Sequence, residues 1–472
     1  MKKILLIIIF FFTLSLLGNE LPELGSSFDS YINASDEKKI KFQILSQVYS
    51  SNTVINDPEI NDYLFNLGNE LIKNGTSEKP EVNFFILNDN SINAFAMLGN
   101  VIGVHSGLIL AANSESELAS VLSHEIAHLT QKHLLRLFDS QAKNSYKSYL
   151  ALAVAILAAR SSPQLSSGAI TVASASQVQN LLSYTRSNEQ EADRIGLQIL
   201  HKAGFDTKGA IDFFSTMQKF NNFSDGAAPA FLRTHPITTE RISDLQDRLK
   251  NYNYIQKQSK IEFYFTKSKL LALTGKYSEI ENIFKNEIKM KTYINEYASY
   301  YGLVCSLLRL NKISEAREVF NILKKKNVSS PMLIELEANL LLKEKNYQDT
   351  FELYKKGLNK YPFNRVFILG VSNLILSSNE ADKAIKLLKS FLPYYDKDPF
   401  FYELLARAYN QNTDFLLEHE SLSNLYYYQY DLQNAILHMD LAVKSNSENF
   451  YDQSRVEHKL KELKREAELM KN

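Results

Sequence analysis

The chain has 472 residues, of which 45% are hydrophobic, and this is enough to build the cores of two or three domains. Its 53 basic and 53 acidic residues cancel, which speaks against a nucleic-acid-binding protein, since such proteins carry an excess of positive charge. The single cysteine, Cys305, excludes an internal disulfide, so packing or a bound metal must stabilise the fold.

The N-terminus has the layout of a signal peptide. Two lysines precede an apolar run from Ile4 to Leu17, which is shorter than the roughly 20 residues that span a bilayer. We expect residues 1–18 to be a signal peptide that is cleaved near Gly18. Leu16 fits a cleavage site poorly, so an uncleaved anchor is the alternative.

Short apolar segments follow a first helical region. Residues 81–87 and 92–98 are predicted to be strands, and a turn separates them from the apolar segment 101–110. A free strand edge can bind an unfolded chain through its backbone. The alternative is an ordinary hairpin core. The residues expected at the substrate-binding edge are Asn93, Ala94 and Phe95.

Residues 121–130, VLSHEIAHLT, place two histidines four residues apart. Ser114 and Glu117 have the spacing of a capping box, which predicts that a helix begins here. His124 and His128 then share one face of the helix and can bind one ion. Glu125 is rotated away from that face, so it can act on a water at the ion without binding the ion. The alternative is a pair of hydrogen-bonded histidines on a half-buried helix, and a third ligand would decide between the two.

A second helix, predicted over residues 183–200, supplies candidates for that ligand. A catalytic zinc ion takes three protein ligands and one open position. Glu189 and Asp193 lie four residues apart, so one carboxylate can bind the ion while the other accepts the ring N–H of a ligating histidine. Glu191 is a rival ligand, but it faces another side of the helix. A solvated helix face is the alternative for all these acids.

The remaining histidines of this half receive structural interpretations. His133 is expected off the metal face, His105 within a strand, and His201 at the end of the second helix. His235 precedes a proline and can simply set a turn. Residues 140–182 include an apolar stretch too short to span a bilayer, which predicts either a helical insertion near the cleft or a buried helix.

The C-terminal half is repetitive, with small residues at steps of 34 residues, which is the period of tetratricopeptide repeats. Residues 261–288 look like an earlier copy of the repeat. Ala435 lies 51 residues beyond the last aligned position, which indicates an extra helix around 399–415. A charged final helix is typical of the cap of such an array. The aligned small residues are Ala316, Thr350 and Ala384, and the larger residues four positions later are Phe320, Tyr354 and Leu388.

Four motifs, in order along the chain, resemble the HExxH zinc metallopeptidases of the CAAX prenyl protease and HtpX type. Because repeats follow the motifs, the layout is most similar to the periplasmic BepA-like branch of that family. The matching pieces are the segment 93–109, the pair His124 and His128 around Glu125, the E-x-x-A-D pattern from Glu189 to Asp193, and the His-Pro pair at His235 with Arg241.

The resemblance implies a mostly α-helical fold. We expect a zincin-like metalloprotease domain, made of helices and a small β-sheet, over residues 19–254, and a tetratricopeptide-repeat solenoid over 255–472. It also implies one Zn²⁺ per chain, bound by His124, His128 and Glu189.

The resemblance further implies a role for each supporting residue. Glu125 is the expected catalytic residue, and Asp193 is expected to support a histidine ligand. His235 and Arg241 are expected to be regulatory or to act on the transition state, since the histidine of this segment can reach the metal in a closed state and displace the catalytic water.

By resemblance, the function is that of a periplasmic zinc endopeptidase that hydrolyses unfolded or misassembled proteins. The expected partners are these substrates, outer-membrane β-barrel proteins and their assembly machinery, and peripheral association with a membrane is compatible with this. The alternative is a largely latent protease that acts as a chaperone or scaffold for outer-membrane protein assembly. We expect no membrane span after the first 18 residues, which disfavours an integral-membrane or prenyl-protein protease.

Overall fold

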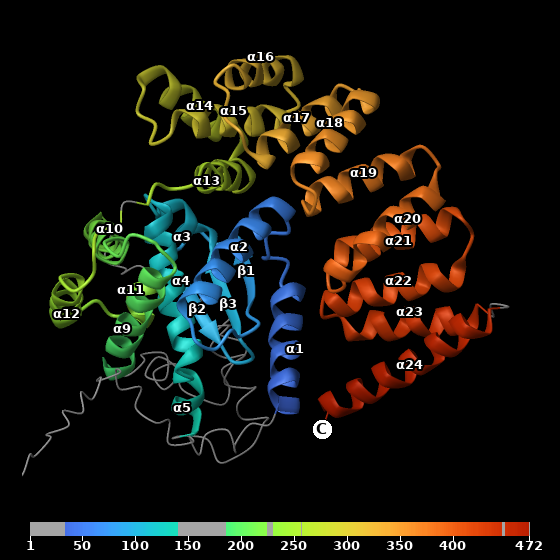
Figure 1. The fold of residues 1–472 in the computed structure, drawn as a ribbon, viewed down its shortest axis with the longest axis horizontal. Helices are drawn as coiled ribbons and strands as arrows, with labels where there is room; N and C mark the ends of the chain where they lie inside the picture. The colour runs from blue at the N-terminus through green and yellow to red at the C-terminus, as the bar shows by residue number, and fades with distance from the viewer. Residues whose placement is uncertain (1–33, 140–185, 224–229, 256, 446–448, 472) are drawn as a thin grey trace, which may run out of the picture.

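The computed structural model describes residues 34–139, 186–223, 230–255, 257–445 and 449–471. The predicted signal peptide (1–18) and the predicted insertion (140–182) lie outside these ranges. The first half of the described chain gathers around a small sheet, and the second half curves past it as a row of helices (Figure 1). The chain is mostly α-helical, as predicted. Within the described ranges, no helix has the length and apolar character that crossing a membrane requires.

The sheet of the first half has three strands, β1 (Asn83–Leu87), β2 (Ala94–Met97) and β3 (Val101–His105). Their order is β1-β3-β2, with β1 parallel and β2 antiparallel to β3. Gly99 and Asn100 both have positive φ angles, 77° and 56°, which is the backbone of a tight hairpin turn between β2 and β3. The predicted strands are therefore present, and β2 lies at an edge of the described sheet.

Helices cover the two faces of this sheet. The helix α4 begins as predicted, because the Glu117 N–H donates to Ser114 Oγ at 3.1 Å. The Glu117 carboxylate accepts from the N–H of Asn113, one residue earlier than a capping box predicts. The helices of this half are α1 (Ala34–Ser50), α2 (Pro58–Gly75), α3 (Ser106–Ala111), α4 (Glu115–Thr130), α5 (His133–Asp139), α9 (Arg186–Lys202), α10 (Gly209–Phe223), α11 (Ala230–Thr234) and α12 (Thr239–Leu249).

The helix α4 is the centre of the main hydrophobic core. Leu118, Leu122 and Ile126 are fully buried in one cluster with side chains of α2, α9 and α10. Burying each such side chain contributes about 1.5–3 kcal/mol. Close packing on all sides fixes the position of α4, and with it the position of the polar residues that α4 carries.

The second half of the chain is an array of paired helices. The aligned residues Ala316, Thr350 and Ala384 are fully buried, and the larger residues four positions later are buried as well, which confirms the predicted repeat register. Two helices separate α20 from α23 instead of one, which confirms the predicted extra helix. The array consists of α13 (Ile261–Thr274), α14 (Tyr277–Met290), α15 (Glu296–Arg309), α16 (Ile313–Lys324), α17 (Pro331–Lys343), α18 (Tyr347–Lys360), α19 (Arg365–Ser377), α20 (Ala381–Phe391), η2 (Leu392–Tyr394), α21 (Pro399–Gln411), α22 (Phe415–Tyr428), α23 (Leu432–Lys444) and α24 (Phe450–Lys471).

The two halves contact each other at both ends of the array. At the near end, Lys269 of α13 donates to Glu59 of α2 at 2.7 Å and also to Asp57. At the far end, α24 returns to α1, where Gln43 Nε2 donates to the carbonyl of Met470 at 3.2 Å. The neighbouring rings of Phe42 and Tyr427 lie 5.7 Å apart. The last described helix thus packs beside the first (Figure 1).

Buried carboxylates at the near end make the stability of the chain depend on pH. Burial raises the pKa of Glu59 above its ordinary value of 4.5, although Lys269 opposes this shift. Burial likewise raises the pKa of the neighbouring Glu335. The native junction therefore holds protons that the unfolded chain releases.

We expect a Glu59→Gln variant to lose part of this pH dependence. The stabilisation from a raised carboxyl pKa is complete below pH 4.5 and is lost as the pH rises through the raised pKa. From about pH 5 to about pH 8, the unfolding free energy of the wild type should therefore fall relative to that of Glu59→Gln by roughly 1–3 kcal/mol. Thermal unfolding of both proteins across this range measures the difference. Parallel curves would show that Glu59 releases its proton at the same pH in both states.

Candidate metal centre

Two histidines of α4 point their rings toward the same place. His124 and His128 lie one helical turn apart, and their Nε2 atoms are 3.0 Å from each other. The exposed fractions are 7% and 2%, so neither ring relies on bulk water for its hydrogen bonds. Two buried ring nitrogens that face each other this closely indicate a shared ligand.

The helix α9 crosses α4 at this point and brings two carboxylates. A Cβ on Gly196 would lie 3.1 Å from both Cα and N of His124, so the close approach of α9 depends on the missing side chain. Glu189 Oε2 lies 3.5 Å from His124 Nε2, and Glu189 Oε1 lies 3.5 Å from His128 Nε2. Asp193 Oδ1 lies on the other side of the His124 ring, 3.1 Å from Nδ1. The structure thus places Glu189 on the face that both histidines share.

Arg241 of α12 holds these carboxylates in place. Its Nε and Nη2 donate to the two oxygens of Asp193 at 2.7 and 2.8 Å. Its Nη1 pairs with Glu189 Oε2 at 2.9 Å and donates to the carbonyl of Pro236 at 2.8 Å. The guanidinium is buried, with 3% exposed, so it connects α9 to the segment that carries the His-Pro pair.

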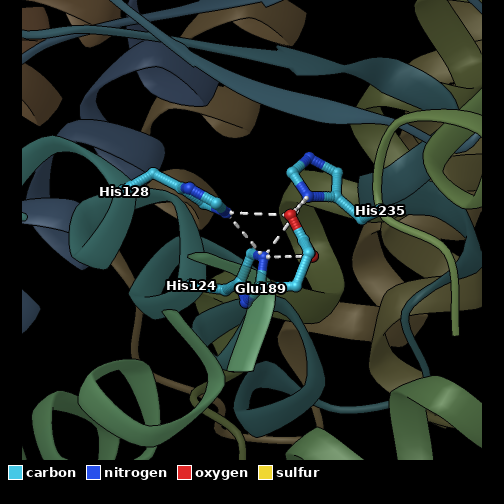
Figure 2. Close-up of side chains that lie close together, drawn as sticks. All are labelled: His124, His128, Glu189 and His235. Carbon is cyan, nitrogen blue, oxygen red and sulfur yellow. Dashed lines mark hydrogen bonds and ion pairs between the residues drawn. The ribbon is translucent and has the colours of Figure 1, made fainter. Parts of the chain in front are cut away.

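The His235 ring completes the cluster from a third direction (Figure 2). Its Nδ1 lies 3.0 Å from Glu189 Oε1 and 3.4 Å from His124 Nε2. The ring is fully buried and stacks on Phe231 at 4.8 Å between centroids. The N–H of Phe231 donates to the carbonyl of Ile92, just before β2, so α11 is tied to the end of the edge strand.

The donor set and its spacing fit a zinc ion. One ligand atom from each of His124, His128, Glu189 and His235 can be chosen so that all lie within 4.8 Å of one another. Contacting pairs are separated by 3.0–3.5 Å. Around zinc, with bond lengths of about 2.0–2.1 Å, tetrahedral ligands lie about 3.3 Å apart. Imidazole nitrogens with one carboxylate are ligands that zinc prefers.

The charges of the cluster are strongly coupled. Burial disfavours a charged imidazole, but hydrogen bonds to Asp193 and Glu189 outweigh this and raise the pKa of His124 to about 10. Burial, with the nearby positive charge of His124, holds the pKa of His128 well below its ordinary value. Burial opposes ionisation of Glu189, yet His235 and His124 hold its pKa well below 4.5. A cation is therefore favoured at this cluster, and without a metal a proton supplies the charge.

Glu125 lies beside the cluster without joining it. Both of its carboxylate oxygens are buried, and they accept no hydrogen bond within the part of the chain that the structure describes. The nearest ring nitrogen is His235 Nε2, 3.6 Å from Glu125 Oε1. A buried carboxylate without hydrogen bonds is costly and usually has a functional reason. The position is suited to receiving a proton from a water at the metal.

The predicted edge residues lie near this centre. β2 pairs only with β3 among the described strands, and α4 packs against β2. Asn93 Oδ1 is buried and has no hydrogen-bond partner among the described residues, so it can accept from a substrate N–H. Ala94 and Phe95 are fully buried, and the Phe95 ring packs against Phe85 at 6.0 Å. Phe95 can therefore offer substrate only its backbone.

Sequence reasoning missed a second set of contacts on His128. His133, which was expected to lie off the metal face, places its Nδ1 2.8 Å from Nδ1 of His128. Glu191, the rival ligand, does not join the cluster but lies 3.1 Å from His133 Nε2. His105 also has a partner, the hydroxyl of Ser91 at 2.8 Å. His201 packs against Tyr252 at the end of α9, as expected.

Comparison with known proteins gives a consistent result. Residues 58–249 match Peptidase family M48. The chain is 31% identical over 394 residues to the putative beta-barrel assembly-enhancing protease of Vibrio cholerae, covering 82% of this chain and 81% of that protein. It is 29% identical over 393 residues to the beta-barrel assembly-enhancing protease of Escherichia coli K12, covering 83% and 80%. Metalloprotease YcaL of Escherichia coli K12 is 31% identical over 189 residues, which are 39% of this chain and 66% of that protein.

Proposed function

Because this chain belongs to peptidase family M48 and is a metallopeptidase, we propose that it is a zinc-dependent endopeptidase that cleaves unfolded or misassembled proteins. The observation that carries the proposal is the convergence of His124, His128 and Glu189, with the buried carboxylate of Glu125 beside them. Three protein ligands leave one position for water or substrate, which is the arrangement of a catalytic zinc site.

Each residue of the site has a task in peptide hydrolysis. When bound, a zinc ion supplies Lewis acidity, which polarises the scissile carbonyl and lowers the pKa of a water. Glu125 takes a proton from the attacking water and later delivers it to the leaving amine nitrogen. Asp193 accepts the Nδ1 proton of His124 and thereby leaves Nε2 of that ring directed at the cluster. Arg241 fixes Asp193 and Glu189 in these positions.

Substrate would bind as an extra strand along β2. The backbone of Asn93, Ala94 and Phe95 would pair with an extended peptide, and the side chain of Asn93 would accept one further hydrogen bond. Such pairing recognises backbone in preference to sequence. It therefore suits unfolded segments, which expose their backbone groups, as substrates.

His235 would keep the site closed at rest. Its ring occupies the fourth position of the cluster and lies between the ligands and Glu125. The bond from Phe231 to Ile92 places the same segment at the start of the substrate edge. Opening of α11 would free both the fourth position and the end of β2. Protease activity would then appear only when a client or partner displaces this segment.

The location and clients follow from the relatives and from the N-terminal segment. The V. cholerae and E. coli K12 proteins are named for β-barrel assembly, and residues 1–18 have the composition of a signal peptide. We therefore place this chain in the periplasm, where it would act in the quality control of outer-membrane β-barrel proteins. The repeat array would hold clients or the assembly machinery on its concave surface.

We expect a His235→Ala variant to cleave casein faster than the wild type. Removing the ring frees the fourth position, and the gain is about 10-fold if one wild-type molecule in ten is open. A zinc chelator should silence both proteins. His201→Ala, which removes a histidine distant from the cluster in the same half, serves as the matched control. Initial rates of casein cleavage measure the effect.

The other outcomes separate the competing functions. A slower His235→Ala variant would mean that His235 assists the transition state and does not inhibit. A wild type that binds one zinc per chain but stays silent, together with a silent His235→Ala variant, would favour the chaperone or scaffold function.

A further inference from the structure

The two histidine ligands of α4 have their outer nitrogens held in different ways. A ring that binds a metal through Nε2 must carry its proton on Nδ1, and that proton needs an acceptor. For His124 the acceptor is the carboxylate of Asp193, at 3.1 Å from Nδ1. Asp193 is in turn held by Arg241 through two hydrogen bonds.

For His128 the corresponding acceptor is another histidine. His133 Nδ1 lies 2.8 Å from His128 Nδ1, and both rings are buried. The far nitrogen of His133 lies 3.1 Å from Glu191 Oε2. Arg136 Nη2 donates to the same carboxylate oxygen at 3.0 Å. The contacts thus run from α4 through α5 to α9 and end, as on His124, in a carboxylate paired with an arginine.

Only one arrangement of protons satisfies this chain of contacts with a metal at His128. His128 Nδ1 must donate to His133 Nδ1, because His128 Nε2 offers its lone pair to the metal. His133 Nδ1 is then an acceptor, so the proton of the neutral His133 ring sits on Nε2 and is donated to Glu191. An ionised carboxylate only accepts hydrogen bonds. Glu191 therefore fixes the tautomer of His133, and His133 fixes the tautomer of His128.

The backbone supports a built contact. The turn between α4 and α5 passes through Lys132, whose φ of 51° lies in the left-handed region that non-glycine residues rarely adopt. This conformation begins α5 at His133 and folds the ring back onto the end of α4. A conformation of this kind has a cost and persists where the surrounding contacts fix it.

We propose that His133 and Glu191 are positioning residues that orient His128 for metal binding. This inference rests on the proposed zinc site. Neither residue touches the metal or the substrate, and both act through His128. Outer partners of metal-ligating histidines typically change metal affinity by about 10–100-fold when they are removed. The alternative is a purely structural role, in which the contacts only join α5 to α9.

Two variants and one matched control separate these roles. Glu191→Gln removes the charge at the outer end of the relay, where the side chain is 29% exposed and the fold should tolerate the change. His133→Phe keeps a ring but removes the acceptor next to His128. Glu70→Gln is the control, because Glu70 is 26% exposed and pairs with two cations, Lys257 and Lys260, away from the metal centre.

The measurements are zinc affinity by chelator competition, the visible absorption spectrum with cobalt in place of zinc, and unfolding of the metal-free proteins. We expect zinc affinity to fall about 10–100-fold for His133→Phe and about 10-fold for Glu191→Gln, with a changed cobalt spectrum. Glu70→Gln should match the wild type in both. Metal-free Glu191→Gln should unfold like Glu70→Gln.

The results distinguish failure of this inference from failure of the proposed function. If the wild type binds zinc and cleaves casein while both variants keep its affinity and cobalt spectrum, the relay has no positioning role. Lower metal-free stability of Glu191→Gln at unchanged affinity would assign a structural role instead and would equally overturn the inference. If the wild type binds no zinc at all, the proposed function itself fails.

Discussion

Replacing Glu125 with glutamine is expected to lower the rate of casein cleavage by about 10²–10⁴-fold, which is the usual contribution of a general base. Glutamine has nearly the same shape but cannot take a proton from water. Glu125 is fully buried beside the metal cluster and accepts no hydrogen bond from the described residues, so no other contact should be lost. The zinc content of the variant should stay at one per chain, since Glu125 lies outside the ligand set.

A second glutamate on the same helix provides the control for this prediction. Glu117 is also buried, and its carboxylate accepts hydrogen bonds from Asn113 at the start of α4. Glu117→Gln removes one charge from α4 while an acceptor oxygen remains, so its activity should stay close to that of the wild type. Equal rates for Glu125→Gln and Glu117→Gln would show that Glu125 is not the base. Loss of zinc from Glu125→Gln would show that it serves the metal directly.

Replacing Arg241 with methionine is expected to lower the free energy of unfolding by about 3–5 kcal/mol, the cost of removing one partner of a buried ion pair. Arg241 is 3% exposed and makes charged contacts with both Asp193 and Glu189. Without it these two carboxylates remain buried and only partly paired. Denaturant unfolding of the metal-free proteins measures the difference without a contribution from bound zinc.

Another arginine of α12 separates burial from charge in this experiment. Arg248 pairs with Asp244 at 2.7 Å, the same distance as the shortest Arg241 contact, but its side chain is 37% exposed. Because solvent screens such pairs, Arg248→Met should cost only about 0–1 kcal/mol. Similar losses for both variants would show that the buried network around Arg241 does not stabilise the fold.

The sequence predicted the inner part of the metal centre because helix geometry decides it. The spacing between His124 and His128, and that between Glu189 and Asp193, places each pair on one helix face whatever the rest of the chain does. The packing of the two helices against each other needed a second signal. Gly196 was such a signal, since a glycine inside a helix indicates a close approach, but its partner could be seen only in the structure.

The outer contacts could not be predicted in the same way. His133 lies five residues after His128, which is the wrong face of a continuous helix. Helix α4 ends at Thr130, and the left-handed Lys132 turns the chain so that the His133 ring returns to His128. No spacing rule anticipates a turn through a lysine in that conformation. Glu191 was weighed only as a metal ligand, because its partner on α5 was assigned to no contact.

The repeat array was predictable for a related reason. A period of 34 residues reports a packing that recurs, so buried small residues such as Ala316 and Ala384 could be placed from the sequence alone. Contacts that occur once carry no such periodic signal. The approach of the array to α1 and α2, through residues such as Tyr430 and Lys269, therefore became visible only in the structure.

The return of α24 to α1 sets an order of assembly for the chain. Gln43 and Met470 are 427 positions apart, and the bond from Asn83 to Tyr430 spans 347 positions. During synthesis α1 emerges early, yet the aromatic partners of Phe42 arrive only with the last helices. The entropy of closing so long a loop rises only slowly with its length, so the delay is mainly one of time. The apolar side of α1 must therefore wait uncovered while the rest of the chain is made, and this helix is among the first segments to appear and among the last to be buried.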